Sequence, residues 1–456
     1  MAGKEKERVI EIEKKLKSIS GKEKNWVIEI EENLKSILCP SKEAELRRKH
    51  SIYRVPVFVK ALNSKAYTPQ MVAFGPYHHH KQDLQPMEVH KTRALLTFLH
   101  RTNKPLDAYL RALEKVVQQL MDSYEDLDEE WRDKDHFLKL MMRDGCFLHE
   151  LLHTSEGISD YYPDNDPIFS YHGMLYNLPC IRRDMLMIEN QVPLLVLERL
   201  VKVSTGGKKN ECGFLDQLIL KLCTSQTLPI TENLGIGLHI LDVFRKSMIQ
   251  GVSPKFQRSS AAAQGSTGGG SGGLVQSALE MHDAGIRFKK SGTTNIDDVD
   301  FMIHPGILQL PAITVDDATE FTFLNLLAFE RLHKDAGNEV TSYIFLMDKV
   351  IDTAKDVQIL RSKGIVKNAL GSDEAVADLF NKISKDMPLD PYCRLKGLHQ
   401  NVSNYCNKRT HRWKATLRHY YFINPWVTLS VVAAFILLAL DTTQTIHSVL
   451  SYYLKD

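Results

Sequence analysis

The chain has 456 residues, of which 43% are hydrophobic and 25% are charged, a composition typical of proteins that bury a core. Its 58 basic and 56 acidic residues nearly cancel to a net charge of +2, which argues against nucleic-acid binding because that function needs a concentrated basic face. The seven cysteines are odd in number and scattered, so they predict no disulfide framework and fit a reducing compartment.

Residues 1–38 contain an internal repeat: the stretch that begins at Lys4 recurs in similar form from Lys22, with differences that include Trp26 in the place of Arg8. The two copies lie about five helical turns apart, so one apolar face continues through both. This pattern predicts a duplicated amphipathic helical arm. It would either dock on a partner or, as we favour, cover the body, because two short copies make a weak coiled coil.

Residues 39–258 are expected to form the first part of a helical body. The prolines between Pro40 and Pro76 favour extended segments and turns. The spacing of apolar residues then predicts helices after Pro86 and after Pro105, the latter to about residue 120, and over 135–153, 182–201, 214–222 and 234–248. Pro193 lies inside the predicted 182–201 helix and should kink it, freeing carbonyls that the amides of Asn190 or Gln191 could satisfy.

A Ser/Gly-rich stretch, residues 259–273, is expected to be a flexible linker. Residues 274–420 follow as the second part of the helical body. Alternating or β-branched residues at 286–288, 299–303 and 307–315 predict a small sheet of two or three strands. Helices are predicted at 278–282, 318–332, 340–354 and 373–383, with a long one from about residue 393 to 420.

Residues 421–445 are predicted to form a single transmembrane helix, with residues 446–456 as a tail. No charged residue occurs from Phe422 to Leu440, and the run from Trp426 to Leu440 is almost purely apolar. A helix over 422–440 would be about 28 Å long, close to the hydrocarbon core of about 30 Å. Aromatic residues flank the run on both sides, as at the headgroup level, so we favour a span over a buried core helix.

Basic residues are concentrated on one side of this run. Lys408, Arg409, Arg412, Lys414 and Arg418 precede it, whereas Lys455 is the only Lys or Arg after it. Positive charge marks the cytoplasmic side of a span, so the body is expected in the cytoplasm, held by a C-terminal anchor with membrane lipid as its partner. The sequence does not distinguish the plasma membrane from an endomembrane.

Candidate chemistry is sparse. Cys146, His149 and His153 fall on one helical face, but that face is otherwise apolar, so core residues are favoured over a zinc site. Residues 78–80 with His90 are favoured as exposed loop residues over metal ligands, because adjacent side chains point in different directions. No P-loop, dinucleotide fingerprint or paired-cysteine site is present, so neither cofactor nor metal is predicted.

Several ordered motifs run from about residue 50 to the C-terminus. They are Ile52-Tyr53-Arg54-Val55-Pro56, Ala66 to Pro69, Gly75-Pro76-Tyr77-His78-His79, Met87-Glu88 with Lys91, Asp144 to Phe147, Glu189-Asn190-Gln191-Val192-Pro193, Ala284 to Phe288, Asn325 to Glu330 and Tyr421 to Trp426. Together they resemble the plant family called domain of unknown function 247; His80 departs from the glycine usual there. The resemblance implies a mostly helical plant protein with a C-terminal membrane segment and no established activity. Some grass members sit at self-incompatibility loci and look like recognition determinants.

The expected fold is mainly α with a small β element: a multi-helix body followed by a single C-terminal transmembrane helix. Trp426 and Leu440 mark the expected anchor, and the motif residues form the candidate functional or structural set. That set is Tyr53, Arg54, Pro56, Gly75, Pro76, His78, Asp144, Glu189, Asn190, Gln191 and Pro193.

For these motif residues we favour a structural role, in which Gly75 and Pro76 set a turn, Asp144 caps or pairs, and residues 189–191 satisfy backbone groups near Pro193. The predicted function is that of a membrane-anchored interaction or recognition protein with a protein partner and no catalysis. The alternative is an unrecognised enzyme with a site near Asp144, Glu189 and His78. Convergence of those three groups on one concave site would favour the enzyme.

Overall fold

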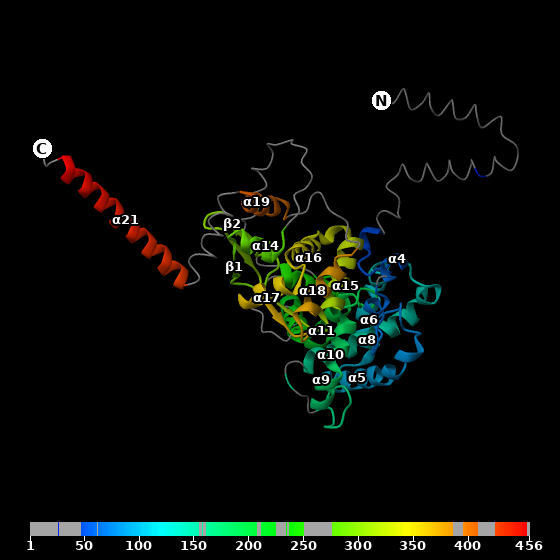
Figure 1. Cartoon of the computed structure of the whole chain (residues 1–456). Coiled ribbons are helices and arrows are strands. Elements are labelled where there is room, and N and C mark those ends of the chain that lie inside the picture. The colour runs from blue at the N-terminus through cyan, green and yellow to red at the C-terminus, as the bar shows by residue number, and fades with distance from the viewer. Residues whose placement is uncertain are drawn as a thin grey trace, which may run out of the picture.

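The computed structural model describes residues 47–61, 63–154, 161–207, 211–224, 237–249, 276–385, 395–408 and 425–453, together with Trp26, Gly157 and Leu234. Trp26 apart, the duplicated arm lies outside the described residues, as do the linker at 259–273 and the basic segment at 409–418. In the described part, helices dominate (Figure 1), so the predicted, mainly α fold with a small β element is confirmed.

The first part of the body is built around α8 (Lys134–Thr154), whose apolar side chains are nearly all buried. Gly145 lets α11 approach closely, because a Cβ there would lie only 2.7 Å from Val196 Cγ1 and 2.8 Å from Leu200 Cδ1. α8 packs against α5 (Pro86–Thr102), α6 (Leu106–Glu114), α11 (Leu194–Thr205) and α12 (Glu211–Cys223). The shorter helices are α4 (Val57–Lys60), α7 (Val117–Asp122), α9 (Tyr171–Tyr176), α10 (Leu178–Met185) and α13 (Ile240–Ile249), with 3₁₀ turns η1 (Ser64–Tyr67), η2 (Gln82–Leu84) and η3 (Glu129–Arg132).

The predicted small sheet is present in the second part of the body. β1 (Arg287–Lys290) pairs in parallel with β3 (Ile307–Leu310), and β2 (Asp300–Met302) pairs with β3 in the antiparallel sense. β4 (Ile313–Val315) joins β5 (Val366–Asn368) in a separate parallel pair. β5 was not predicted, because its three residues, one of them Lys367, are too few to show an alternating pattern.

In Figure 1, β1 and β2 lie at one edge of the body, with helices beside them. The helices of this part are α14 (Ala278–Asp283), α15 (Thr319–Leu332), α16 (Glu339–Val350), α17 (Ala354–Ser362), α18 (Asp373–Ile383) and α19 (Lys396–Asn407), with the 3₁₀ turn η5 (Lys334–Ala336). Buried side chains such as Leu148, Leu241, Met347 and Phe380 belong to one hydrophobic cluster. The parts before and after the linker therefore share a continuous core.

Several predicted helices are wrong in their extent, three of them through a break or an early end. The 182–201 helix is two helices, since α10 ends at Met185 and Pro193 is the N-cap of α11 rather than a kink within it. The helix after Pro105 breaks between α6 and α7, where Val116 leaves the helical conformation with φ −122° and ψ 7°. The helix predicted to run to residue 420 ends at Asn407, after which Lys408 is extended.

The last described element is α21 (Pro425–Tyr453), which stands apart from the body in Figure 1. Its stretch Leu429–Leu450 is long and apolar enough to cross a membrane, and none of the most apolar window of that stretch is buried. The helix includes Asp441 and continues through residues 446–453, which belong to the stretch expected as a tail.

Candidate functional site

Most of the predicted motif residues gather around one irregular stretch, residues 70–78, which we call the clamped segment. It joins no helix or sheet, yet residues 72–76 are buried. Buried N–H and C=O groups need partners, and here no neighbouring strand supplies them. Side chains from α5, α8, α10 and the loop 186–193 do so instead.

Asp184 and Asn190 hold the first half of the clamped segment. The Asp184 carboxylate accepts hydrogen bonds from the backbone N–H groups of Gln70 (3.1 Å), Met71 (2.7 Å) and Val72 (3.0 Å). Asn190 Oδ1 accepts from Phe74 N–H at 2.7 Å, and its Nδ2 donates to the Val72 carbonyl at 2.9 Å. Burial raises the pKa of Asp184 despite these N–H donors.

Lys91 and Asp144 hold the second half. Lys91 Nζ lies 2.7 Å from Asp144 Oδ1 and also donates to the Ala73 carbonyl, while Asp144 Oδ2 accepts from Gly75 N–H at 2.8 Å. Both charged side chains are fully buried. Burial raises the pKa of Asp144, and the Lys91 ammonium opposes that rise by favouring the carboxylate. Glu88 adds a second carboxylate at 2.8 Å from Nζ.

Gly75 provides the turn in the clamped segment. Its φ is +67°, a left-handed conformation that side chains disfavour. A Cβ at this position would lie 2.6 Å from the Gln191 carbonyl oxygen and 2.9 Å from the Tyr124 hydroxyl. Those two groups are themselves joined, because the Tyr124 hydroxyl donates to the Gln191 carbonyl at 2.9 Å. Pro76 follows the turn and is buried.

Glu189 forms a second, adjacent cluster. It accepts from Val55 N–H at 2.5 Å, pairs with Lys60 Nζ at 2.7 Å and lies 3.3 Å from His78 Nε2. Burial raises the pKa of Glu189, but the hydrogen bonds from His78 and Lys60 outweigh it and the pKa is lowered overall. Burial lowers the pKa of His78, so this imidazole favours its neutral form.

The Gln191 side chain hydrogen-bonds backbone groups of the loop between α10 and α11, where Pro193 prevents one continuous helix. Its Nε2 donates to the carbonyls of Met185 (2.6 Å), the last residue of α10, and of Met187 (2.7 Å) just after it, and its Oε1 accepts from Leu241 N–H at 3.3 Å. Asn190 Nδ2 likewise reaches the Asp184 carbonyl at 2.9 Å. The two amides therefore satisfy carbonyls of the broken helix, although the break is a loop rather than the expected kink.

The remaining motif residues lie at the entrance to the clamped segment. The Tyr53 hydroxyl donates to the His50 carbonyl at 2.7 Å. The Arg54 guanidinium covers the Tyr77 ring at 4.3 Å and pairs with Asp128 at 2.7 Å. Pro56 is the N-cap residue of α4, where a missing N–H removes no hydrogen bond.

The three groups of the enzyme hypothesis are brought together only in part. His78 and Glu189 are in contact, whereas in the described residues no hydrogen bond or ion pair joins Asp144 to either of them. Each of the two carboxylates receives a backbone N–H, which is a structural use. Sequence reasoning missed Asp184 and Tyr124; Asp184 follows Arg182 and Arg183 in the last turn of α10, so nothing local distinguishes it from a surface carboxylate.

The histidine run divides between two environments. His78 is buried against Glu189, so its expected exposure is wrong. His80 is exposed, as expected, and lies 2.5 Å from Glu130. His79 packs edge-on against the buried Trp131 ring at 5.3 Å, and burial lowers the pKa of His79 to about 4.

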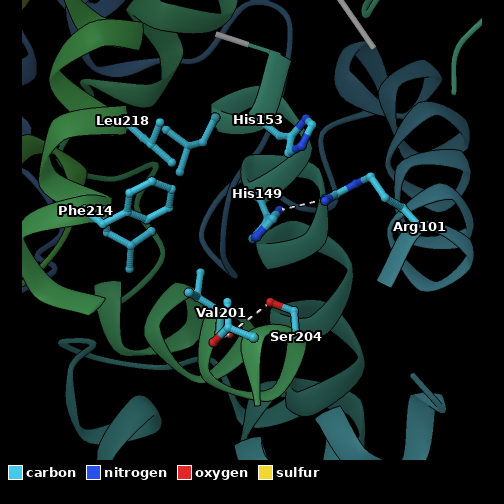
Figure 2. A pocket seen from close by; sticks show the side chains of 10 residues that line it. Arg101, His149, His153, Val201, Ser204, Phe214 and Leu218 are labelled. Carbon is cyan, nitrogen blue, oxygen red and sulfur yellow. Dashed lines mark hydrogen bonds between the residues drawn. The ribbon is translucent and has the colours of Figure 1, made fainter. Parts of the chain in front are cut away.

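Cys146, His149 and His153 lie on α8 as predicted, and Cys146 is fully buried. Figure 2 shows His149 and His153 on the wall of a cavity of about 180 Å³, with Arg101 on one side and Phe214 and Leu218 on the other. Arg101 pairs with Glu150 at 2.5 Å. Among the described residues, no group of three or more His, Cys, Asp or Glu side chains is arranged to hold a metal ion.

These features define a class of protein: a helical body with an internally bonded polar core and a separate apolar C-terminal helix. A family profile described as "plant protein of unknown function" (DUF247) matches residues 52–440, and the chain belongs to that family.

Two Arabidopsis thaliana proteins are similar to the chain over most of its length. UPF0481 protein At3g47200 is 30% identical over 88% of this chain and 86% of its own. Putative UPF0481 protein At3g02645 is 23% identical over 89% of this chain and 91% of its own. No solved structure matches.

Proposed function

We propose that this chain is a membrane-anchored plant protein whose helical body lies in the cytoplasm and binds a protein partner without catalysis. The exposure of α21 is the observation that carries this proposal. Large apolar side chains along α21 are exposed, among them Trp426 (78%), Phe435 (72%) and Leu438 (66%). Water-soluble monomers rarely expose a continuous apolar surface of this extent, whereas a bilayer would cover it.

Asp441 sets the far border of the proposed span. The strictly apolar part of α21 ends at Leu440, and a carboxylate at the bilayer centre would cost about 2.5–3.5 kcal/mol. We therefore place Leu440 near the far headgroups, with Asp441 in the interface. The near side carries the basic residues from Lys408 to Arg418, which supports a cytoplasmic body.

Alkaline carbonate extraction of membranes that contain the full chain tests the anchor. We expect the protein in the pellet, and we expect Phe435→Arg combined with Leu438→Arg to release it, since two charges oppose insertion. Tyr171→Arg with Leu175→Arg on α9 is a matched control, because it replaces two exposed apolar residues of the body at a similar spacing. Wild-type protein in the supernatant would overturn the anchor.

The proposed partner site is the apolar face of α9. Tyr171, Leu175 and Tyr176 are 70%, 53% and 63% exposed on this one short helix. Clusters of exposed apolar side chains mark interaction sites. Proximity labelling with the full chain should identify a set of proteins that the Tyr171→Ser, Leu175→Ser variant loses. An unchanged set would contradict this site, and an empty one would contradict the binding role.

A role in self-incompatibility would be the most specific version of this proposal, and it rests only on the resemblance to grass members.

The enzyme alternative has one observation in its favour, the contact between His78 and Glu189 at 3.3 Å. His78, Asp144 and Glu189 line neither the cavity beside His149 nor the cavity at Arg182. The backbone hydrogen bonds of both carboxylates support the structural role.

A further inference from the structure

A second cavity, of about 340 Å³, lies where the two parts of the body meet. Its walls come from α10, α12 and α13 before the linker and from the β3–β4 connection, α15 and α16 after it. The volume is at the lower end of the range of about 300–1,000 Å³ that small-molecule sites occupy. Six of the apolar side chains in its walls are Leu186, Phe244, Met248, Ile296, Ile313 and Phe323.

Arg182 on α10 places a positive charge in the wall of this cavity. It is half-buried, its Nε is inaccessible to water without a hydrogen-bond partner, and no described carboxylate forms an ion pair with it. The neighbouring Cys223 supplies no countercharge, because burial raises the pKa of its thiol to about 12. The guanidinium therefore lines the cavity without a countercharge among the described residues.

The adjacent Arg183 also lines the cavity and its Nε likewise has no hydrogen-bond partner, but its terminal nitrogens are partnered. Its guanidinium donates to Gln70 Oε1 at 2.7 Å, lies 3.5 Å from Asp184 Oδ1 and covers the Phe321 ring at 5.3 Å. Arg182 has none of these contacts within the described chain. The contrast leaves the Arg182 guanidinium open to a partner from outside the described residues.

A phenol provides a further polar group inside the cavity. Tyr343 on α16 is buried, and its hydroxyl has no hydrogen-bond partner among the described residues. Burial raises the pKa of Tyr343 well above its ordinary value, so the hydroxyl remains a neutral donor. Asp316, which is exposed, is the acidic residue of the lining; one carboxylate at the cavity disfavours a ligand with several negative charges.

We propose that this cavity binds a small organic monoanion, a carboxylate carried on an aromatic or branched aliphatic body. Arg182 receives the carboxylate, for which the guanidinium offers a bidentate arrangement of donors. The Tyr343 hydroxyl donates to the ligand, and the apolar walls bury its body. This site is independent of the membrane anchor and of the α9 surface.

Isothermal titration of the full chain in lipid nanodiscs with 4-phenylbutyrate tests the proposal, with 4-phenylbutanamide as the uncharged counterpart. We expect the acid to bind at least about tenfold more tightly than the amide, and Arg182→Gln to weaken the acid by a similar factor. Arg199→Gln is the matched control, because Arg199 also has an unpartnered Nε but lies outside this cavity. It should bind as the wild type does.

Two further variants keep the test independent of folding. Tyr343→Phe removes only the hydroxyl and should weaken the acid several-fold, and Thr322→Leu should block binding by filling the cavity while Arg182 stays in place. Without ligand, Arg182→Gln should melt no lower than the wild type, since it removes an unpaired charge. The proposal is overturned if acid and amide bind alike, if neither binds, or if Arg182→Gln melts several degrees lower.

Discussion

Lys91 on α5 and Asp144 on α8 form an ion pair at 2.7 Å in which both side chains are fully buried. The pair does not stand alone, because Lys91 also donates to the Ala73 carbonyl and Asp144 accepts from Gly75 N–H. Each charge thus joins a helix to the clamped segment. The pair fixes an irregular backbone within the core, a task that a pair of apolar residues could not perform.

Asp144→Ala should destabilise the protein by about 3–5 kcal/mol, because the buried Lys91 ammonium keeps only Glu88 as a partner and the N–H of Gly75 loses its acceptor. Urea-induced unfolding measures this loss. Adding Lys91→Met to Asp144→Ala should recover part of it, since the second change removes the charge that has lost its buried partner.

A matched control is Asp107→Ala, which removes the i,i+4 partner of Arg111 on the surface of α6. We expect at most about 0.5 kcal/mol there, because exposed pairs contribute little. If the Asp144 variant were equally mild, the buried pair would not have the structural role described.

Gly75→Ala should cost about 2–4 kcal/mol, from the left-handed φ and from the clash of the new Cβ with the Gln191 carbonyl. Gly364→Ala separates these causes. Gly364 has φ +69°, close to that of Gly75, but nothing lies within 4 Å of its Cβ position.

We expect Gly364→Ala to lose only about 1–2 kcal/mol, the conformational part. Thermal or urea unfolding of both variants gives the comparison. Equal losses would show that the close approach to Gln191 contributes nothing.

Elements with a strong local pattern could be predicted from the sequence, and contacts between distant segments could not. The apolar periodicity of α8 and the alternation of buried residues in β3 can each be recognised within one short stretch of sequence. The apolar residues on both sides of Pro193 continue with helical spacing, which predicts one kinked helix. The actual place of Pro193 at an N-cap depends on Gln191, which satisfies the freed carbonyls from within the loop.

The hydrogen bonds that hold the clamped segment could not be predicted from the sequence for the same reason. Asp184 bonds to backbone more than a hundred residues earlier, and nothing local distinguishes it from a surface carboxylate. The motif residues could be named, but their shared purpose, to satisfy one buried stretch of backbone, appears only when the chain is folded.

Stability should fall as the pH is lowered from 7 toward 4, and His239 gives the physical reason. It is fully buried, its Nε2 lies 3.0 Å from the Ser51 carbonyl, and its Nδ1 accepts from Asp242 N–H at 3.2 Å. This neutral tautomer is fully bonded, and burial lowers the pKa of His239 to about 4. The unfolded chain takes up the proton near pH 6.5, so the stability present above 6.5 is lost as the pH falls toward 4.

Urea unfolding at pH 7, 6 and 5 should show that His239→Gln flattens this dependence by up to about 1.4 kcal/mol per pH unit. His100→Gln, which changes an exposed histidine on α5, should leave the slope unaltered. A parallel profile for His239→Gln would mean that another group controls the pH dependence.

Asn401 offers an internal test of the proposed topology. It begins the glycosylation sequon Asn401-Val402-Ser403 and is exposed on α19, on the side of α21 that we place in the cytoplasm. Translation of the full chain into microsomes should leave Asn401 unmodified, because the glycosylation machinery acts in the lumen. A flexible tag with an acceptor sequon, appended after Asp456, should in contrast be glycosylated, and endoglycosidase treatment should reverse the resulting mass shift. Modification of Asn401 with an unmodified tag would place the body in the lumen and reverse the orientation that the basic residues predict.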